Sequence, residues 1–319
     1  TLLATPPHAH ALVVEMGMNA FGEIALLQDI SKPTVRLITN VGAAHLEGVG
    51  SLDGVARAKG ELFDGARPGD ICCVNIDDPR IRDRPLPKGV RVVTYGRSPE
   101  AQVRLLSARV DGSTLATRFE IATATATVRG ILESPGLHLA HNATAAMAVA
   151  VALELDPVQA AERVASYQPV GMRQRLQSGP GSIQVINDAY NANPLSTRVS
   201  VETLAAVAGR RRVALLGDML ELGPNEDSLH EEAIAHVLTQ GLDLVGTAGP
   251  RFARARDRLA SAGHAGASAV LSAPDAPALA ALISARLAPG DLVLLKGSRG
   301  VAMESVLEHI AVPEAPKEG

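Results

Sequence analysis

Short apolar runs alternate with amphipathic stretches along the second half of the chain, and this alternation predicts an α/β fold. The runs predicted as strands are Ile183–Asn187, Val213–Leu216, Leu242–Val245, Ala269–Leu271 and Leu292–Leu295. The helices predicted around them are Leu195–Ala208, Asp227–Thr239, Phe252–Ala262, Ala276–Leu287 and Val301–Ile310. Because strands and helices alternate, we expect a doubly wound, Rossmann-like sheet in this half.

The first half shows the same alternation and then a change of texture. Residues 10–17, HALVVEMG, are typical of a strand covered on both faces. Between residues 103 and 132 the pattern alternates with period two around the turn signal Asp111-Gly112, which predicts a small antiparallel sheet. The other predicted strands are Val35–Thr39, Ile71–Ile76 and Arg91–Tyr95, and the predicted helices are Ala20–Ile30, a helix after Ser51, Ala140–Leu153 and Pro157–Tyr167.

Gly and Pro concentrate between residues 168 and 181, where we place a domain boundary. The predicted domains are residues 1–169 and 170–319. A chain of 319 residues is long enough for two such domains.

Composition and charge narrow the classes of function. The chain carries 30 Lys and Arg against 34 Asp and Glu, a net charge of −4, which speaks against a general nucleic-acid binder. Its two cysteines, Cys72 and Cys73, are adjacent within a predicted strand and therefore point to opposite faces, so they are poorly placed to bridge each other. No apolar stretch is long enough to span a bilayer. We expect a cytoplasmic protein without membrane insertion.

Lys59 is the unusual residue of the first half. In the helix after Ser51, Leu52, Val55 and Leu62 form an apolar stripe, and Lys59 falls within it. One interpretation is that the stem covers apolar surface while the ammonium reaches water. The other is that burial lowers the pKa and leaves a neutral amine, which can take up carbon dioxide as a carbamate with oxygens suited to magnesium.

Glu15 and His45 are candidate partners of Lys59. Glu15 closes the predicted strand of residues 10–17, and His45 follows the strand Val35–Thr39. Open α/β sheets bind ligands at the carboxyl ends of their strands. If the two strands are parallel, both side chains face one crevice.

Polar residues also follow three predicted strands of the second half. They are Asp188, Asp218 and the segment Lys296-Gly297-Ser298-Arg299-Gly300. Either they form a ligand-binding edge, or Asp and Gly simply make the tight turns that such connections need. The last segment is basic and rich in glycine, which favours binding of a carboxylate.

Five segments carry a resemblance to a known family. They resemble the motifs of the Mur ligases of bacterial cell-wall synthesis, in the same order and over nearly the whole chain. The segments are EMGMNAFGEIA, ITNVGAAHLEGVGSLDGVARAKGELF, HNATAAMA, INDAYNANPLS and LGDMLELG. The resemblance implies an N-terminally truncated P-loop-type central ATPase domain with a small antiparallel sheet, followed by a doubly wound, Rossmann-like C-terminal domain. It also implies ATP and Mg²⁺ as cofactors, with a carbamylated Lys59, Glu15 and His45 around the metal.

The same resemblance implies roles for further residues. Asn142 would contact the adenine, although the family's second Asn is replaced by Ala145; without the resemblance, His141-Asn142 would be taken as a helix cap. Arg175 and Asp188 would contact the nucleotide. We assign Asp218, Lys296 and Arg299 to the substrate at the peptide or D-alanyl-D-alanine end. The tetrapeptide Asp77-Asp78-Pro79-Arg80 resembles a substrate-reading motif of another Mur ligase, but it lies in the wrong domain, so we expect a plain strand-to-turn connection.

The resemblance favours ligation of D-alanyl-D-alanine to UDP-N-acetylmuramoyl-tripeptide through an acyl phosphate, by a monomer. The chain holds no G-x-x-x-x-G-K-[ST] phosphate loop, which the family carries upstream of this point, so we expect the chain alone to be inactive. Two alternatives remain open. One is a ligase like folylpolyglutamate synthase, and the other is a non-catalytic nucleotide-binding or interaction module.

Overall fold

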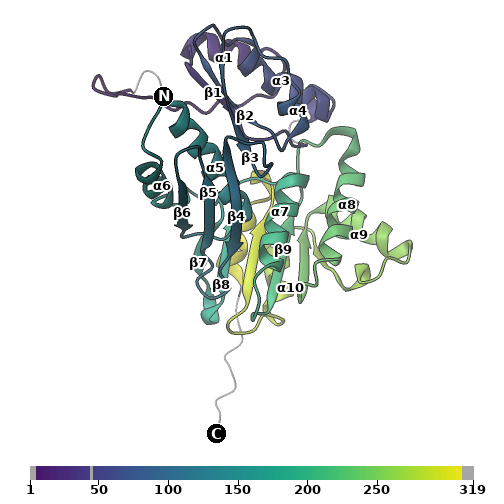
Figure 1. Ribbon diagram of the computed structural model, residues 1–319. Helices are drawn as coiled ribbons and strands as arrows, with labels where there is room; N and C mark the ends of the chain where they lie inside the picture. Colours follow the sequence, from purple (N-terminus) through teal and green to yellow (C-terminus); the bar gives the residue numbers. More distant parts are fainter. Residues whose placement is uncertain (1–4, 44–45, 311–319) are drawn as a thin grey trace. The chain divides into compact units, whose positions relative to one another are not determined.

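The structure, a computed structural model, describes residues 5–43 and 46–310. The chain forms two compact units, and Figure 1 labels their helices and strands. Unit 1 contains residues 1–106, 121–128 and 141–161, and unit 2 contains residues 107–120, 129–140 and 162–319. The division of the chain into domains at residue 170 stays a prediction.

The first sheet has six strands in the order β1-β2-β3-β4-β5-β6. The neighbours from β1 to β4 are parallel, and short turns at residues 111–116 and 123–126 make the last pairs antiparallel, as the sequence predicts. The strands are β1 (Val35–Ile38), β2 (Ile71–Asn75), β3 (Arg91–Gly96), β4 (Val103–Val110), β5 (Thr117–Ala122) and β6 (Thr127–Leu132). The accompanying helices are α1 (Glu23–Ser31), α2 (Leu46–Val49), α3 (Leu52–Asp64), α4 (Pro79–Arg82), α5 (Leu137–Ala152) and α6 (Pro157–Ala165).

The predicted strand at residues 10–17 is wrong, because this segment forms neither strand nor helix. A strand needs a neighbour that pairs with its backbone and a cover for its apolar side chains. Here Leu12 is exposed and Val13 is 92% exposed, so the apolar run has no such cover in the described part of unit 1. The sequence pattern identifies an apolar run, but it does not show whether another strand pairs with that run.

The helix-cap interpretation of His141-Asn142 is also wrong, because α5 begins at Leu137, ahead of both residues. The start is set by Gly136, whose φ of +153° is a conformation that L side chains rarely adopt. The Gly136 amide donates to Oγ1 of Thr117 at 2.9 Å, which fixes the chain just before the helix. His141 and Asn142 therefore lie inside the helix.

The second sheet has the order β11-β10-β9-β12-β8-β7. All neighbours are parallel except β7 and β8, so a parallel, doubly wound sheet ends in one antiparallel edge strand that the sequence pattern did not predict. Its strands are β7 (Arg175–Ser178), β8 (Gln184–Asp188), β9 (Arg212–Gly217), β10 (Leu244–Ala248), β11 (Leu271–Ala273) and β12 (Leu292–Lys296). The main helices are α7 (Pro194–Ala205), α8 (Glu226–Leu238), α9 (Pro250–Ser261) and α10 (Ala276–Ser284).

Two separate cores cover the faces of the second sheet. Because successive strand residues point to opposite faces, Ile186 joins the core with Phe252, whereas its neighbour Val185 joins the core with Ile283. All four side chains are fully buried. Burial on both faces explains why the strands of this half read as continuous apolar runs.

The predicted helix Val301–Ile310 is replaced by shorter elements. Two 3-10 turns, η5 (Arg299–Val301) and η6 (Met303–Ser305), precede the short helix α11 (Val306–His309). Ala302 between the two turns has a left-handed φ of +53°, which a continuous α-helix cannot contain.

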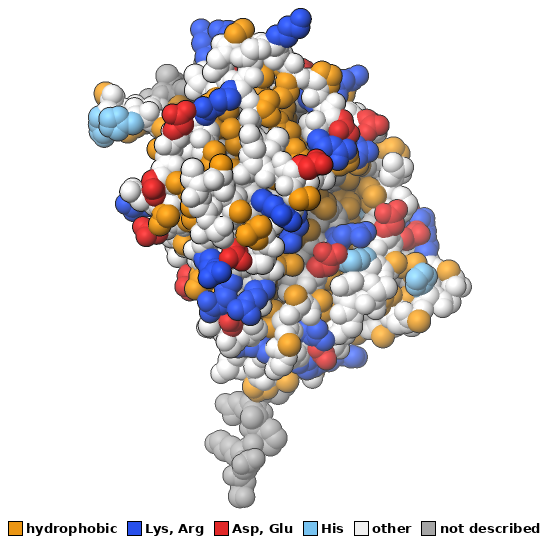
Figure 2. All heavy atoms as spheres, viewed as in Figure 1, with side chains coloured by type: hydrophobic (Ala, Val, Ile, Leu, Met, Phe, Trp, Pro, Cys, Tyr) orange, Lys and Arg blue, Asp and Glu red, His pale blue; other side chains and the backbone are white. Residues whose placement is uncertain are grey.

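On the surface over α8 and α9, acidic and basic side chains lie next to one another (Figure 2).

Candidate functional site

Helix α3 carries Lys59 at the carboxyl end of β1. As the sequence predicts, Ser51 is the N-cap, and its hydroxyl accepts the Gly54 N–H at 3.0 Å. Val55 and Phe63 are fully buried and hold the helix against unit 1. Lys59 is half-buried, and its Nζ donates to the carbonyl oxygen of Asn40, two residues beyond β1, at 2.9 Å.

The surroundings of Lys59 favour an uncharged amine. Burial lowers the pKa of Lys59, and the charge of Asp78 only partly opposes this. Among the described residues, its one hydrogen-bond partner is a neutral carbonyl, which stabilises an ammonium less than a carboxylate would. The amine therefore has the chemical character that addition of carbon dioxide requires, while the carbamate itself stays a prediction.

The other two predicted metal ligands are Glu15 and His45. His45 lies outside the described residues. Glu15 is exposed on the segment that lacks secondary structure, and neither a hydrogen bond nor an ion pair links it to Lys59. In the described part of the chain, no group of three or more His, Cys, Asp or Glu residues could hold a metal ion. Metal binding by Glu15, His45 and Lys59 thus remains a prediction.

Asn142 lies on the exposed side of α5, next to a histidine with a defined partner. Nε2 of His141 accepts a hydrogen bond from Nε of Arg97 at 3.1 Å, so the ring proton is on Nδ1. Burial, and then the positive charge of Arg97, lower the pKa of His141 and keep it neutral. Ala145 is buried, so this departure from the family motif faces the interior of the unit.

In unit 2, Asp188 and Lys296 occupy the ends of neighbouring parallel strands and form an ion pair. Their backbones pair across β8 and β12, and Nζ of Lys296 donates to Oδ2 of Asp188 at 2.6 Å. Lys296 is only 2% exposed and also donates to the Asn191 carbonyl at 3.0 Å. The sequence predicts these two residues for different ligands, whereas the structure joins them.

Asp188 has further donors around it. The Ser200 hydroxyl donates to Oδ2 at 2.7 Å, and the Gln174 N–H donates to Oδ1 at 3.2 Å. Gln174 is buried with a left-handed φ of +56°, which a non-glycine residue adopts only when its surroundings enforce it. The carboxylate is thus oriented before any ligand arrives.

The arginines of this edge are accessible. Arg175 is exposed at the start of β7, and Arg299 is exposed and paired with Glu304. The sequence interpretation did not include Arg173, whose guanidinium lies over the Tyr190 ring at 4.1 Å from its centroid. Tyr190 follows Asp188 by two positions in the DAYNANP segment, so that segment held the signal for this pair.

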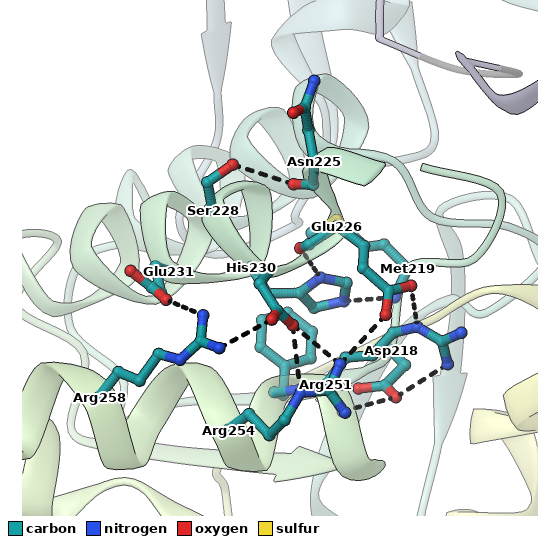
Figure 3. Close-up of polar contacts among 12 residues, drawn as sticks. Asp218, Met219, Asn225, Glu226, Ser228, His230, Glu231, Arg251, Arg254 and Arg258 are labelled. Atoms are coloured by element: carbon teal, nitrogen blue, oxygen red, sulfur yellow. Dashed lines mark hydrogen bonds and ion pairs between the residues drawn. The ribbon is translucent and has the colours of Figure 1, made fainter. Parts of the chain in front are cut away.

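Asp218 is placed differently from the other strand-end residues. It is 2% exposed, and its two oxygens accept the N–H groups of Arg251 and Phe252 at 3.0 and 2.9 Å, in the first turn of α9 (Figure 3). A carboxylate at a helix N-terminus is stabilised by both the N–H groups and the helix dipole. This contact gives Asp218 a structural task, and its role in substrate binding stays a prediction.

His230 completes the surroundings of Asp218. Its Nε2 accepts the Met219 N–H at 3.0 Å, and its Nδ1 lies 2.6 Å from the Glu226 carbonyl, so the ring is the neutral Nδ1–H tautomer (Figure 3). Burial lowers the pKa of His230. The network holds the loop after β9 in one arrangement.

Comparison with known families gives two matches along the chain. The profile described as "Mur ligase middle domain" matches residues 1–150, and the profile described as "Mur ligase, glutamate ligase domain" matches residues 172–299. Both belong to one family.

Curated relatives share the name "UDP-N-acetylmuramoyl-tripeptide--D-alanyl-D-alanine ligase". The relative from Escherichia coli is 32% identical over 97% of this chain and 67% of its own length. The relatives from Bacillus subtilis and Synechocystis are 30% and 34% identical over 97% of this chain, which spans 66% and 65% of their lengths. The chain thus spans about two thirds of these proteins.

Solved structures agree with these relatives. MurF from Acinetobacter baumannii superposes with a TM-score of 0.81 at 26% identity, over 92% of this chain and 62% of that one. MurF ligase from Thermotoga maritima in complex with ADP gives a TM-score of 0.80 at 26% identity, over 92% of this chain and 65% of that one.

Within residues 5–43 and 46–310, this chain has no helix long and apolar enough to cross a membrane.

Proposed function

The chain belongs to the Mur ligase family, and from this membership we propose that it takes part in the ATP-dependent ligation of D-alanyl-D-alanine to UDP-N-acetylmuramoyl-tripeptide. The observation that carries the proposal is the match over 97% of the chain to relatives that all bear the name of this ligase. The likeness to a MurF ligase in complex with ADP supports an adenine nucleotide as ligand.

In the proposed reaction, ATP phosphorylates the terminal carboxylate of the tripeptide, and the amine of D-alanyl-D-alanine displaces phosphate to form the amide. The first step brings a carboxylate against the charged phosphates of ATP, and the second releases a phosphate anion, so catalysis rests on positioning and electrostatic stabilisation. Asn142 would contact the adenine. In unit 2, Asp188 and Arg175 would contact the nucleotide. Lys296 and Arg299 would bind the carboxylate-bearing substrate, and Asp218 belongs to the same proposed substrate site.

ATP and Mg²⁺ are the proposed cofactors. Glu15, His45 and a carbamylated Lys59 are the proposed metal ligands, of which the Lys59 amine has the chemical character that the modification needs. When bound, Mg²⁺ would offset the charge of the phosphates. The contribution of Lys59 itself is to present an anion from a half-buried helix position, close to Asp78 and the Asn40 carbonyl.

We further propose a cytoplasmic monomer. Cys72 and Cys73 are buried and free, and burial raises the pKa of their thiols to about 11 and about 12. Such thiols stay protonated and unreactive at neutral pH, which suits a reducing compartment.

A ligation assay tests the proposal. ATP, UDP-N-acetylmuramoyl-tripeptide and D-alanyl-D-alanine are incubated with the 319-residue chain and, separately, with the protein that the complete gene encodes, and the ligated product is measured by mass spectrometry. We expect product from the complete protein and none with L-alanyl-L-alanine in place of the D-dipeptide. Extension of a folate by glutamate, or nucleotide binding without any amide product, would replace the proposal by one of its alternatives.

A further inference from the structure

The carboxyl-terminal end of β2, together with the residues just after it, contacts the loops that follow both neighbouring strands. It contains Asn75, Asp77 and Asp78, the last two within the DDPR tetrapeptide for which the sequence predicts only a turn. β2 lies between β1 and β3 in the sheet, so its carboxyl end adjoins the ends of both. We call these three residues the β2 clasp.

On the β1 side, the clasp holds the loop that carries Asn40. Nδ2 of Asn75 donates to the Thr39 carbonyl at 2.7 Å, and Oδ2 of Asp78 accepts the Val41 N–H at 2.7 Å. The residue between these two contacts is Asn40, whose carbonyl accepts the hydrogen bond from Lys59. The position of that carbonyl is therefore fixed from both sides.

On the β3 side, the clasp holds the loop that carries Arg97. Asp77 accepts the N–H groups of Arg97 and Ser98 at 2.6 and 3.0 Å. Gly96 has a φ of +149°, and a Cβ there would lie 2.6 Å from Oδ1 of Asp77, so the loop approaches the carboxylate more closely than another residue would allow. From this loop, Arg97 donates to Nε2 of His141.

A turn alone does not account for this pattern. A helix cap for α4 needs a single oxygen, which Oδ1 of Asp78 supplies by accepting the Arg80 N–H at 3.0 Å. The other oxygen of Asp78 and both oxygens of Asp77 bond to loops from other strands. Charge-assisted hydrogen bonds to backbone N–H groups are the stronger kind, so both loops are restrained.

We propose that Asp77 and Asp78 are positioning residues for nucleotide binding in unit 1. Asp78 fixes the Asn40 loop against Lys59, and Asp77 fixes Arg97 against His141, the residue that precedes Asn142 in α5. The inference rests on the proposed function, because it takes Asn142 as the adenine contact.

The test replaces Asp77 by Asn in the 319-residue chain, with Asp83→Asn as the matched control. Asp83 is exposed nearby in the chain, and within the described part of the chain its carboxylate bonds only to the adjacent Arg82. Adenosine 5′-monophosphate is the probe, because it needs the adenine contact and no site for the outer phosphates. We expect Asp77→Asn to weaken its binding about tenfold, the size of one such hydrogen bond, in a variant that remains folded at the assay temperature.

The titration of His141, followed by NMR, separates positioning from a simple loss of charge. Asp77 raises the pKa of His141 and Arg97 lowers it. Loss of the Asp77 charge alone would lower this pKa, whereas release of the loop would move Arg97 away and raise it. We expect Asp77→Asn to raise the pKa of His141, and Asp83→Asn to leave both the pKa and the binding unchanged.

If Asp77→Asn does not fold, Arg97→Ala is the second variant to test, because it leaves the backbone contacts of Asp77 in place. It should likewise weaken binding of the probe and raise the pKa of His141. Wild-type affinity in both variants, a fall of the His141 pKa in Asp77→Asn, or no binding of the probe by the unaltered chain would overturn the proposal. Failure of the ligation assay with probe binding intact is a separate result, which counts against the ligase and not against the positioning residues.

Discussion

Lys59 in unit 1 and Lys296 in unit 2 are both withdrawn from solvent near the carboxyl end of a parallel strand, yet their partners differ. Lys296 bonds to a carboxylate, Asp188, at 2.6 Å. Lys59 bonds to a neutral carbonyl, that of Asn40, at 2.9 Å, and burial lowers its pKa. The same side chain thus faces an anion in one unit and a neutral group in the other.

The difference shows what decides the chemistry of a buried lysine. Removal from water disfavours a charged side chain, and a nearby anion offsets that cost. Lys296 is therefore suited to hold charge in a fixed place, and Lys59 is suited to react. The prediction of a modified lysine applies to the one without a carboxylate partner.

The largest expected effect comes from removing that carboxylate. Asp188→Ala leaves Lys296 buried without its anion, so we expect a loss of about 3–5 kcal/mol in the free energy of unfolding. Urea unfolding followed by circular dichroism measures it. Asp257→Ala, which removes an exposed carboxylate of α9 paired with the adjacent Arg256, is the control and should change stability little. A similar small loss in Asp188→Ala would mean that Lys296 does not depend on its partner.

Lys59 should respond in the opposite way. Lys59→Met removes one hydrogen bond to a carbonyl and a desolvated amine, so we expect stability to change by no more than about 1 kcal/mol. If Lys59 becomes a carbamate, the same variant of the complete protein should lose about 10²-fold or more of its ligation rate. The matched control is Lys88→Met, at an exposed lysine of the same unit.

Chemical rescue sharpens this test. In Lys59→Ala, a small carboxylate such as acetate can occupy the space of the missing carbamate and restore part of the ligation rate. Activity that is lost in Lys59→Ala and not restored by acetate would count against the modification. It would leave the stability comparison between the two lysines untouched.

The sequence predicts most elements of both units because apolar period and cap residues are local signals. Ser51 at the start of α3 is one such signal, and the structure confirms it. The pair of Asp188 and Lys296 escapes prediction because the two residues are 108 positions apart and meet only when β12 inserts next to β8. The failed strand at residues 10–17 and the helix start misplaced at Ala140 have the same origin, since tertiary partners decide where an element forms and begins.

His230 adds a third buried base to the comparison, and it predicts a pH dependence. Like Lys59, it bonds only to backbone groups among the residues that the structure describes, and burial lowers its pKa below the ordinary value of 6.5. Below pH 6.5 the unfolded chain takes up a proton that the folded His230 resists, so stability is present above that pH and lost as the pH falls toward the folded pKa.

The size of this effect is at most about 1.4 kcal/mol per pH unit within that window. Unfolding free energies of the wild type and of His230→Gln, measured between pH 7.5 and pH 5 (on the order of one unit either side of the ordinary His pKa), isolate it from the other titrating groups. We expect the wild type to lose more stability on acidification than the variant. Equal losses would show that His230 is not held neutral.

The smallest expected effect concerns the helix that places Lys59. Ser51→Ala removes the hydroxyl that accepts the Gly54 N–H, and loss of an N-cap lowers stability by about 1 kcal/mol. Ser51→Thr keeps the hydroxyl and should stay near the wild type, and Ser107→Ala, at an exposed position of β4, is the control. If the environment of Lys59 depends on a firmly started α3, fraying of the first turn should also reduce ligation in Ser51→Ala and not in Ser51→Thr. Lost stability with unchanged ligation would instead show that the contacts of Val55 and Phe63 alone hold the lysine in place.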